Sequence, residues 1–137
     1  MEFNKGNPML LINFAHPLTD KQFAQIVAIV DETPEIRFVD TQVSRMRPLA
    51  EVAYDLIESV GLKTADWQTI PIIINPPGLA PLALAIIAEL HGRSGYFMPI
   101  INMRPVHNAT SPTFEVGEIC NLDAIRQVAR TRRIPKL

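Results

Sequence analysis

The feature that most constrains the fold is an apolar strand that leads directly into an apolar helix. Residues 70–90 read IPIIINPPGLAPLALAIIAEL. A strand made only of aliphatic residues is typical of the middle of a parallel sheet, where both faces are buried. The turn that leaves it, Asn75-Pro76-Pro77-Gly78, then lies at the carboxyl edge of the sheet, where open α/β sheets bind ligands. We therefore expect an α/β domain organised around this turn.

Strands and helices alternate before this stretch. Residues 9–14 form a short apolar run that predicts a first, central strand. Thr19 and Gln22 have the spacing of a capping box, which predicts the start of a helix. Residues 35–40 alternate between apolar and polar side chains, as is typical of an edge strand. A second helix is expected within residues 48–61, with proline in its first turn and glycine at its end.

Two more strands and a helix are expected after it. Residues 96–104 predict a fourth strand, in which Pro99 argues for an edge position or an early irregularity. A short alternating segment at residues 114–116 predicts a fifth strand. Asn121 is placed to cap a last helix, whose inward face is expected to carry Leu122, Ile125, Val128 and Ala129.

These elements predict one domain over residues 1–137. Two strands are wholly apolar and two are half-polar or contain proline, which predicts the order 2-1-3-4 with strands one and three in the centre. Residues 64–68 are expected to form a turn in which Trp67 covers the core. The expected fold is a Rossmann-like, three-layer α/β sandwich, with a mainly parallel sheet of four or five strands and helices on both faces.

Charge and composition limit the classes of function. The formal net charge is −1, which argues against a protein that grips long nucleic acids through many Lys and Arg contacts. Cys120 is the one cysteine, so an intramolecular disulfide and a cysteine-based zinc cluster are excluded. A reduced, cytoplasmic setting is therefore expected. The first apolar run is too short for a signal peptide or a membrane span, so we expect no membrane partner.

Motifs for cofactors and catalysis are absent from the sequence. The first turn, NFAHPLT, has no glycine for the close approach of a dinucleotide pyrophosphate. The chain also lacks a Walker A motif and the GxSxG and HExxH patterns. His16, His91 and His107 are scattered and have no acidic pair beside them. We therefore expect no cofactor and no metal site, and we assign no catalytic residue.

The expected strand order brings two similar turns together. The turns at residues 13–17 and 75–78 both begin with asparagine and lead to a helix N-terminus, where N–H groups and the helix dipole favour an anion. Each asparagine, and likewise His16, either binds a ligand or only shapes its turn. Arg104 is either a phosphate clamp or a strand-end cation. The residues expected to bind ligand are Asn13, Phe14, His16, Gln42, Asn75, Pro76, Pro77, Gly78, Leu79 and Arg104.

The helix after Gly78 has almost no polar side. Beyond its sheet-facing stripe, Leu84, Ala85 and Ala88 are also apolar, so the helix is expected to be covered on more than one side. In so small a domain, another copy of the chain is the simplest second cover. We predict a homodimer with this helix in its interface.

Three segments resemble one family. LLINFAHPLTDKQ, WQTIPIIINPPGLAPLALAIIAELHGRSGYFMPIINMRPV and NLDAIRQVAR are similar to the small stand-alone CRISPR-associated proteins with a CARF-like, Rossmann-type fold that accompany type III systems. The most specific piece is NPPGLAP followed by ELHGRSG. The resemblance implies a cytoplasmic receptor for cyclic oligoadenylate, the second messenger made when a type III complex detects foreign RNA. It also implies a symmetric dimer that holds the ring across its two-fold axis or between neighbouring dimers.

The resemblance leaves three functions open. Typical CARF proteins fuse the sensor to an effector, and 137 residues are already used by one sheet and its helices. We therefore expect a protein that sequesters the messenger, with cyclic tetra-adenylate as the expected ring, and so regulates the antiviral response. The alternatives are a metal-independent ring nuclease that uses His16 or Arg104, and an interaction subunit without a nucleotide ligand that docks through the apolar helix.

Overall fold

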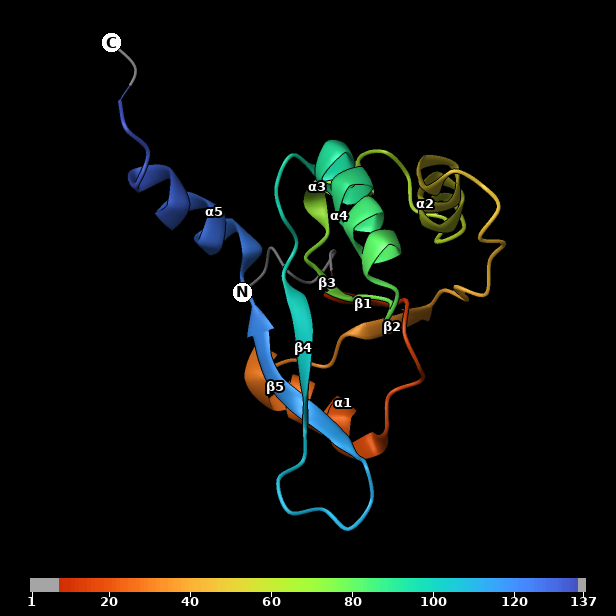
Figure 1. Ribbon diagram of the computed structural model, residues 1–137, viewed down its shortest axis with the longest axis vertical. Helices are drawn as coiled ribbons and strands as arrows, with labels where there is room; N and C mark the ends of the chain where they lie inside the picture. Colours follow the sequence, from red (N-terminus) through yellow and green to blue (C-terminus); the bar gives the residue numbers. More distant parts are fainter. Residues whose placement is uncertain (1–7, 136–137) are drawn as a thin grey trace.

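Five strands form one mainly parallel sheet in the computed structural model, which describes residues 8–135 (Figure 1). The strands are β1 (Leu10–Asn13), β2 (Glu35–Phe38), β3 (Ile72–Asn75), β4 (Ile100–Pro105) and β5 (Phe114–Cys120). Their order in the sheet is β2-β1-β3-β4-β5, which confirms the expected order and adds β5 outside β4. β5 runs antiparallel to β4, whereas all other neighbours are parallel.

Helices cover both faces of this sheet. They are α1 (Asp20–Val30), α2 (Leu49–Glu58), α3 (Asp66–Thr69), α4 (Ala80–Ser94) and α5 (Leu122–Thr131). Side chains of α2, α3 and α4 share one hydrophobic core with one face of the sheet, and α1 shares a second core with the other face. The chain is therefore the expected Rossmann-like α/β sandwich.

The central strands divide the two cores because all of their residues are buried. Successive side chains of a strand point to opposite faces of the sheet. Ile12 and Ile74 accordingly pack with α2, α3 and α4, whereas Leu11 and Ile73 pack with α1. Full burial of one such side chain contributes about 1.5–3 kcal/mol. This explains why the two wholly aliphatic strands occupy the centre of the sheet.

Helix α1 begins at a capping box and also holds β5. Thr19 Oγ1 accepts from the Gln22 amide at 3.1 Å, and Gln22 Oε1 accepts from the Thr19 amide at 3.0 Å. Gln22 Nε2 donates to the Phe114 carbonyl at 2.9 Å. One turn later, Gln25 Oε1 accepts from the amide of Val116 at 2.9 Å. Two glutamines on one side of α1 thus bind the backbone of β5.

The expectation of an edge position for the fourth strand is wrong. Pro99 precedes β4, and its carbonyl accepts from the Ile74 amide at 2.9 Å, so the proline lies before the regular ladder. β5 covers the other side of β4 and is longer than the alternating pattern predicted. The register between them shifts between Asn102 and Met103, where a β-bulge interrupts the ladder. The early irregularity, the second alternative for Pro99, matches the structure.

Other helices of the same chain cover one side of α4. It packs against α2 and α3. The expectation of a turn at residues 64–68 is wrong, because the short helix α3 forms there. Trp67 is buried there, as expected. The guanidinium of Arg93 lies over the Trp67 ring, 5.7 Å from its centroid, and pairs with Glu58 and Glu89 at 2.7 Å each. The outer side of α4 stays exposed along Ala80, Leu84, Ala88 and Gly92, a line that we call the α4 ridge.

The inward packing expected for the last helix is wrong. No residue of α5 is buried, and Ile125 and Val128 are 58% and 48% exposed. α5 starts directly after β5, with Asn121 Oδ1 accepting from the Ala124 amide as expected, and projects away from the sheet (Figure 1). With no linker before it, the helix continues outward from the sheet edge. Its apolar face is therefore not part of the core of its own chain.

Candidate functional site

The two asparagine-led turns lie side by side at the carboxyl ends of β1 and β3. The parallel register aligns Asn13 with Asn75, and both side chains are buried. Asn75 Nδ2 donates to Asn13 Oδ1 at 3.0 Å, although the two residues are 62 positions apart. The expected juxtaposition is thus present, and a side-chain hydrogen bond joins the turns.

The two asparagines have different partners. Asn13 Oδ1 also accepts from the Ala15 amide, and Asn13 Nδ2 donates to the His16 carbonyl, both at 2.9 Å. The oxygen of a side-chain amide can only accept and its nitrogen can only donate, so these contacts fix the orientation of the Asn13 side-chain amide. Asn75 must then donate to Asn13. Its own Oδ1 accepts no hydrogen bond from the part of the chain described here, and Asn75 lines a cavity.

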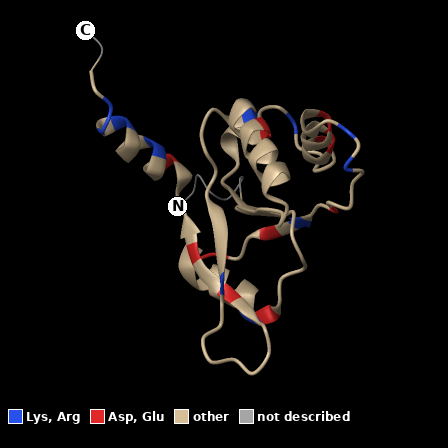
Figure 2. Ribbon diagram, in the orientation of Figure 1, with Lys and Arg blue, Asp and Glu red and all other residues tan. Residues whose placement is uncertain are grey.

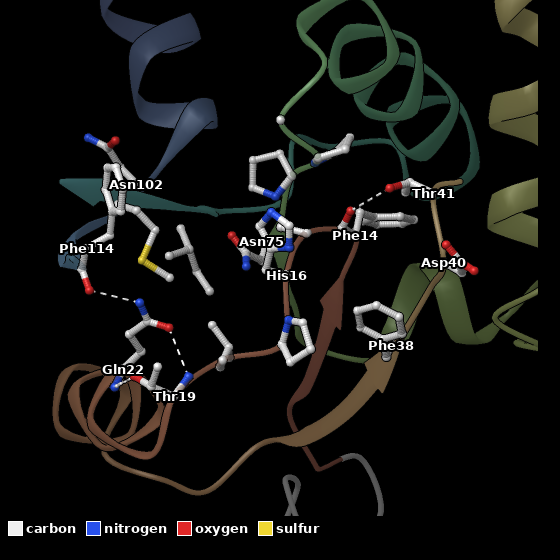
Figure 3. Close-up of a pocket in the computed structure, with 18 of the residues that line it drawn as sticks. Phe14, His16, Thr19, Gln22, Phe38, Asp40, Thr41, Asn75, Asn102 and Phe114 are labelled. Atoms are coloured by element: carbon white, nitrogen blue, oxygen red, sulfur yellow. Dashed lines mark hydrogen bonds between the residues drawn. The ribbon is translucent and has the colours of Figure 1, made fainter. Parts of the chain in front are cut away.

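This cavity has a volume of about 960 Å³ and opens where both turns end (Figure 3). Seven of the expected ligand-binding residues line it: Phe14, His16, Gln42, Asn75, Pro76, Pro77 and Gly78. Asn13 lies behind them, occupied by its turn. Leu79 lines an adjoining cavity of about 210 Å³ that shares Thr41, Gln42, Pro77 and Gly78 with the first.

Arg104 is not brought into either cavity. Its Nε lies 3.0 Å from Glu115 Oε2, and its side chain points along the β4–β5 ladder, where it contacts the carboxylate of the neighbouring strand. Of the two alternatives for Arg104, its position in the structure is that of a cation at a strand end. A phosphate clamp at this position would require Arg104 to leave Glu115.

Two exposed phenylalanines flank the cavity and were not expected there. Phe38 ends β2 and Phe114 begins β5, and they are 55% and 54% exposed (Figure 3). His16 lies between them and is also exposed. Phe38 could have been inferred, because it ends the strand beside β1 at the same carboxyl edge. Phe114 could not, because its place depends on the antiparallel pairing of β5 with β4.

The two helix N-termini differ in their free donors. The first turn of α1 is capped by Thr19 and Gln22. The first turn of α4 has no side-chain cap, since Leu79 occupies the N-cap position. Its backbone N–H groups therefore lack the side-chain partner that a helix start usually has, and the positive end of the dipole is uncompensated. An anion is better matched to α4 than to α1.

Comparisons of the chain with protein-family models, curated proteins and solved structures gave no match.

The charges around the cavity are few. Asp40 is the one Asp or Glu among the lining residues of the larger cavity within residues 8–135, and no Lys or Arg lines it. Arg45 lines the smaller cavity beside the start of α4. Asp40 Oδ1 already accepts from the Gln42 amide at 2.9 Å. Side-chain amides of Gln22, Gln42, Asn75 and Asn102, the imidazole of His16 and three threonine side chains thus lie among the apolar and aromatic lining residues.

Between residues 8 and 135, no cluster of three His, Cys, Asp or Glu side chains could hold a metal ion. No helix in that range is long and apolar enough to cross a membrane.

Proposed function

We propose that the protein binds a cyclic oligoadenylate, cyclic tetra-adenylate in particular, and sequesters it to regulate a type III CRISPR antiviral response. The observation that carries this proposal is a cavity shared by two asparagine-led turns and two exposed phenylalanines, joined to a smaller cavity at the uncapped N-terminus of α4. Its parts match the base and the phosphate of an adenylate. The resemblance of the segments around NPPGLAP and ELHGRSG supports this ligand class.

The aromatic walls suit an adenine base. Stacking of a base on an aromatic side chain contributes about 1–3 kcal/mol. Phe38 and Phe114 offer exposed rings on opposite sides of the cavity, and the His16 imidazole lies between them. The free Oδ1 of Asn75 is an acceptor, which matches the exocyclic amino group of adenine. Asn13 holds Asn75 in place and does not contact the ligand.

The start of α4 suits the phosphate. Gly78 lies in the turn before the helix, and a side chain added at this position would meet no atom within 4 Å. A phosphate can therefore approach the backbone closely at this turn. Arg45, in the adjoining cavity with Leu79, supplies the nearest cationic side chain among the lining residues. One cation and a helix start are enough for a small anion and fit the low net charge of the chain.

We further propose that two copies form a homodimer, because a ring of repeated adenylates presents the same groups more than once. The α4 ridge is the surface that supports this contact. Leu84 at its centre is 72% exposed, and the ridge carries no charged residue. Since α4 begins at the cavity, a two-fold contact along the ridge joins two binding sites in one assembly.

Ring cleavage is the second candidate, and the exposed imidazole of His16 favours it. Cleavage needs the ribose 2′-hydroxyl held in line with the phosphate, with a group that accepts its proton. His16 is the imidazole of this cavity, whereas Arg104 is engaged with Glu115. Sequestration and cleavage share the same binding step and differ only in what happens to the ring.

A ligand panel tests the proposal. Thermal shift and calorimetry are run with cyclic tri-, tetra- and hexa-adenylate, linear tetra-adenylate and ATP. At about a hundred times the dissociation constant, a ligand adds roughly 2.7 kcal/mol of stability. His16→Ala is expected to weaken binding, whereas His107→Ala, an exposed histidine outside the cavity, is the matched control. Absence of binding to every cyclic ring would refute the proposal, and chromatography of rings incubated with excess protein separates holding from cutting.

A further inference from the structure

Helix α5 has an apolar face that the described residues 8–135 leave uncovered. Leu122, Ile125, Val128 and Ala129 fall on one side of the helix at i, i+3 and i+4 spacing, and none of them is buried. A short helix with polar solvent all around it gains little stability from its backbone alone. The described residues 122–135 form what we call the C-terminal arm. Such an arm is stabilised when its apolar face packs on another surface.

The base of the arm is held in an outward direction. The amide of Phe97, in the loop before β4, donates to Asp123 Oδ1 at 3.1 Å. Asn121 caps the same first turn through the Ala124 amide at 3.0 Å. Cys120, directly before the cap, is still paired with Ile100 in the sheet. Folding the arm back onto residues 8–121 would break these contacts, which favours a second molecule as the cover of its apolar face.

Charge separates the arm from the rest of the chain. Residues 122–135 contain four arginines and one aspartate, a net charge of +3. Residues 8–121 contain seven Lys or Arg and twelve Asp or Glu, a net charge of −5. Figure 2 shows the basic residues of α5 on the projecting helix and acidic residues on α1, β2 and β5. The arm is therefore electrostatically complementary to the domain of another copy.

The α1 side of the sheet offers a matching acceptor surface. α1 covers this face, yet Ile29 on α1 and Ile36 on β2 remain exposed. Ile36 lies on that face because it is aligned with Leu11, which packs against α1. The acidic residues on α1 and β2 and between them are Asp20, Asp31, Glu32 and Glu35. Apolar and acidic groups thus occur together there, as apolar and basic groups do on the arm.

We propose that the C-terminal arm of one copy packs on the α1 face of a second copy. The apolar face of the arm covers Ile29 and Ile36, and Arg126 and Arg130 lie near the acidic residues around α1. Reciprocal exchange of two arms gives a closed, two-fold contact. The contact is separate from the α4 ridge and does not rest on nucleotide binding. A membrane surface is a weaker match, because the arm has no aromatic residue to lie in the lipid interface.

Sedimentation equilibrium of single variants tests the contact. Ile125→Glu and Val128→Glu place a charge in the apolar face, whereas Gln127→Glu adds the same charge on the opposite side. We expect association to weaken at least about tenfold, or by roughly 1.4 kcal/mol, in the first two variants and to change little in the third. Leu84→Glu, on the α4 ridge, is expected to retain the arm contact. Circular dichroism checks that α5 stays helical in each variant.

Mixing two defective variants gives a decisive result. Ile29→Glu should damage the acceptor surface and Ile125→Glu the arm, so neither protein associates through this contact alone. In a Leu84→Glu background, which removes the α4 ridge contact, their mixture should form a one-to-one complex, since one copy keeps an intact arm and the other an intact α1 face. Raising the salt concentration from about 0.1 M to 1 M shortens the Debye length from about 10 to 3 Å and should weaken the complex. The proposal is overturned if the wild type stays monomeric, if Ile125→Glu associates like the wild type, or if the mixture forms no complex.

Discussion

Asn75 Nδ2 donates a hydrogen bond to Asn13 Oδ1 at 3.0 Å, and this contact joins the ends of the two central strands. Asn13 binds the Ala15 amide, the His16 carbonyl and the Asn75 amide group. Asn75 lines the cavity, and its Oδ1 accepts no hydrogen bond from residues 8–135. The two asparagines thus differ in how far their side chains are engaged by the fold.

The asparagine pair predicts unequal effects of two alanine substitutions. Asn13→Ala leaves the Ala15 amide and the His16 carbonyl without their partners and should lower the free energy of unfolding by about 1–3 kcal/mol. Asn75→Ala retains the hydrogen bonds of Asn13 to the Ala15 amide and the His16 carbonyl. It should therefore lower the free energy of unfolding by about 1 kcal/mol or less, but weaken cyclic oligoadenylate binding about tenfold. Urea denaturation and calorimetry measure the two quantities. Equal stability losses, or unchanged affinity of Asn75→Ala, would contradict the division of roles.

The exposed phenylalanine of β2 predicts a binding defect without a folding defect. Phe38→Ala should weaken adenylate binding by about 1–3 kcal/mol through lost stacking, and should leave the thermal midpoint nearly unchanged because the ring is half exposed. Ile36→Ala on the same strand is the matched control, since Ile36 does not line the cavity. Calorimetry with cyclic tetra-adenylate should separate the two variants. Equal affinities for both would exclude Phe38 as a stacking platform.

Local signals in the sequence predicted the sheet and one half of the site. The aliphatic strands around Ile12 and Ile74 had to be central because no face of them tolerates water, and the Thr19 capping box fixed the start of α1. Once β1 and β3 are neighbours, Asn13 and Asn75 meet by register alone. Six of the seven expected residues that line the cavity lie in these two turns, whereas Gln42 lies in the segment after β2.

Features that depend on pairing between distant segments were not predictable in the same way. Phe114 reaches the cavity because β5 pairs antiparallel with β4 through a bulge, which no local pattern encodes. The spacing of Leu122, Ile125, Val128 and Ala129 predicted an inward apolar face on the last helix. The spacing identifies an apolar face but does not indicate what covers it, and Ile125 and Val128 stay exposed in the structure.

Two glycines predict opposite effects of the same substitution. A Cβ at Gly117 would lie 3.1 Å from the Asn102 carbonyl oxygen, beside the bulge, so Gly117→Ala should lower stability by about 1 kcal/mol or more. Gly92 lies within α4 with open space around it, so Gly92→Ala should raise stability by about 0.5–1 kcal/mol. Denaturant unfolding of both variants in parallel checks the signs. A stabilising Gly117→Ala would mean that β5 moves to accept the methyl group.

Tyr96 predicts a loss of stability in alkaline solution. Burial, and secondly the charge of Asp123, raise the pKa of Tyr96 above its usual value near 10. The native state therefore holds the phenol proton more tightly than the unfolded state, so this stabilisation is present below pH 10 and is lost as pH rises through the higher native pKa. Tyrosinate absorbance in a Tyr54→Phe background should show the raised pKa, and Asp123→Asn should lower it. An unchanged titration in Asp123→Asn would show that Asp123 does not act on the phenol.

The two glutamine side chains of α1 also occupy backbone groups at the β5 edge of the sheet. An edge strand with free N–H and C=O groups is a template for strand addition by another chain. Gln22 and Gln25 occupy the Phe114 carbonyl and the Val116 amide, so an incoming strand finds these groups taken. At the opposite edge, β2 has four residues, which limits the ladder that a foreign strand could form. The two glutamines thus limit strand addition at the β5 edge, and the short length of β2 limits it at the opposite edge.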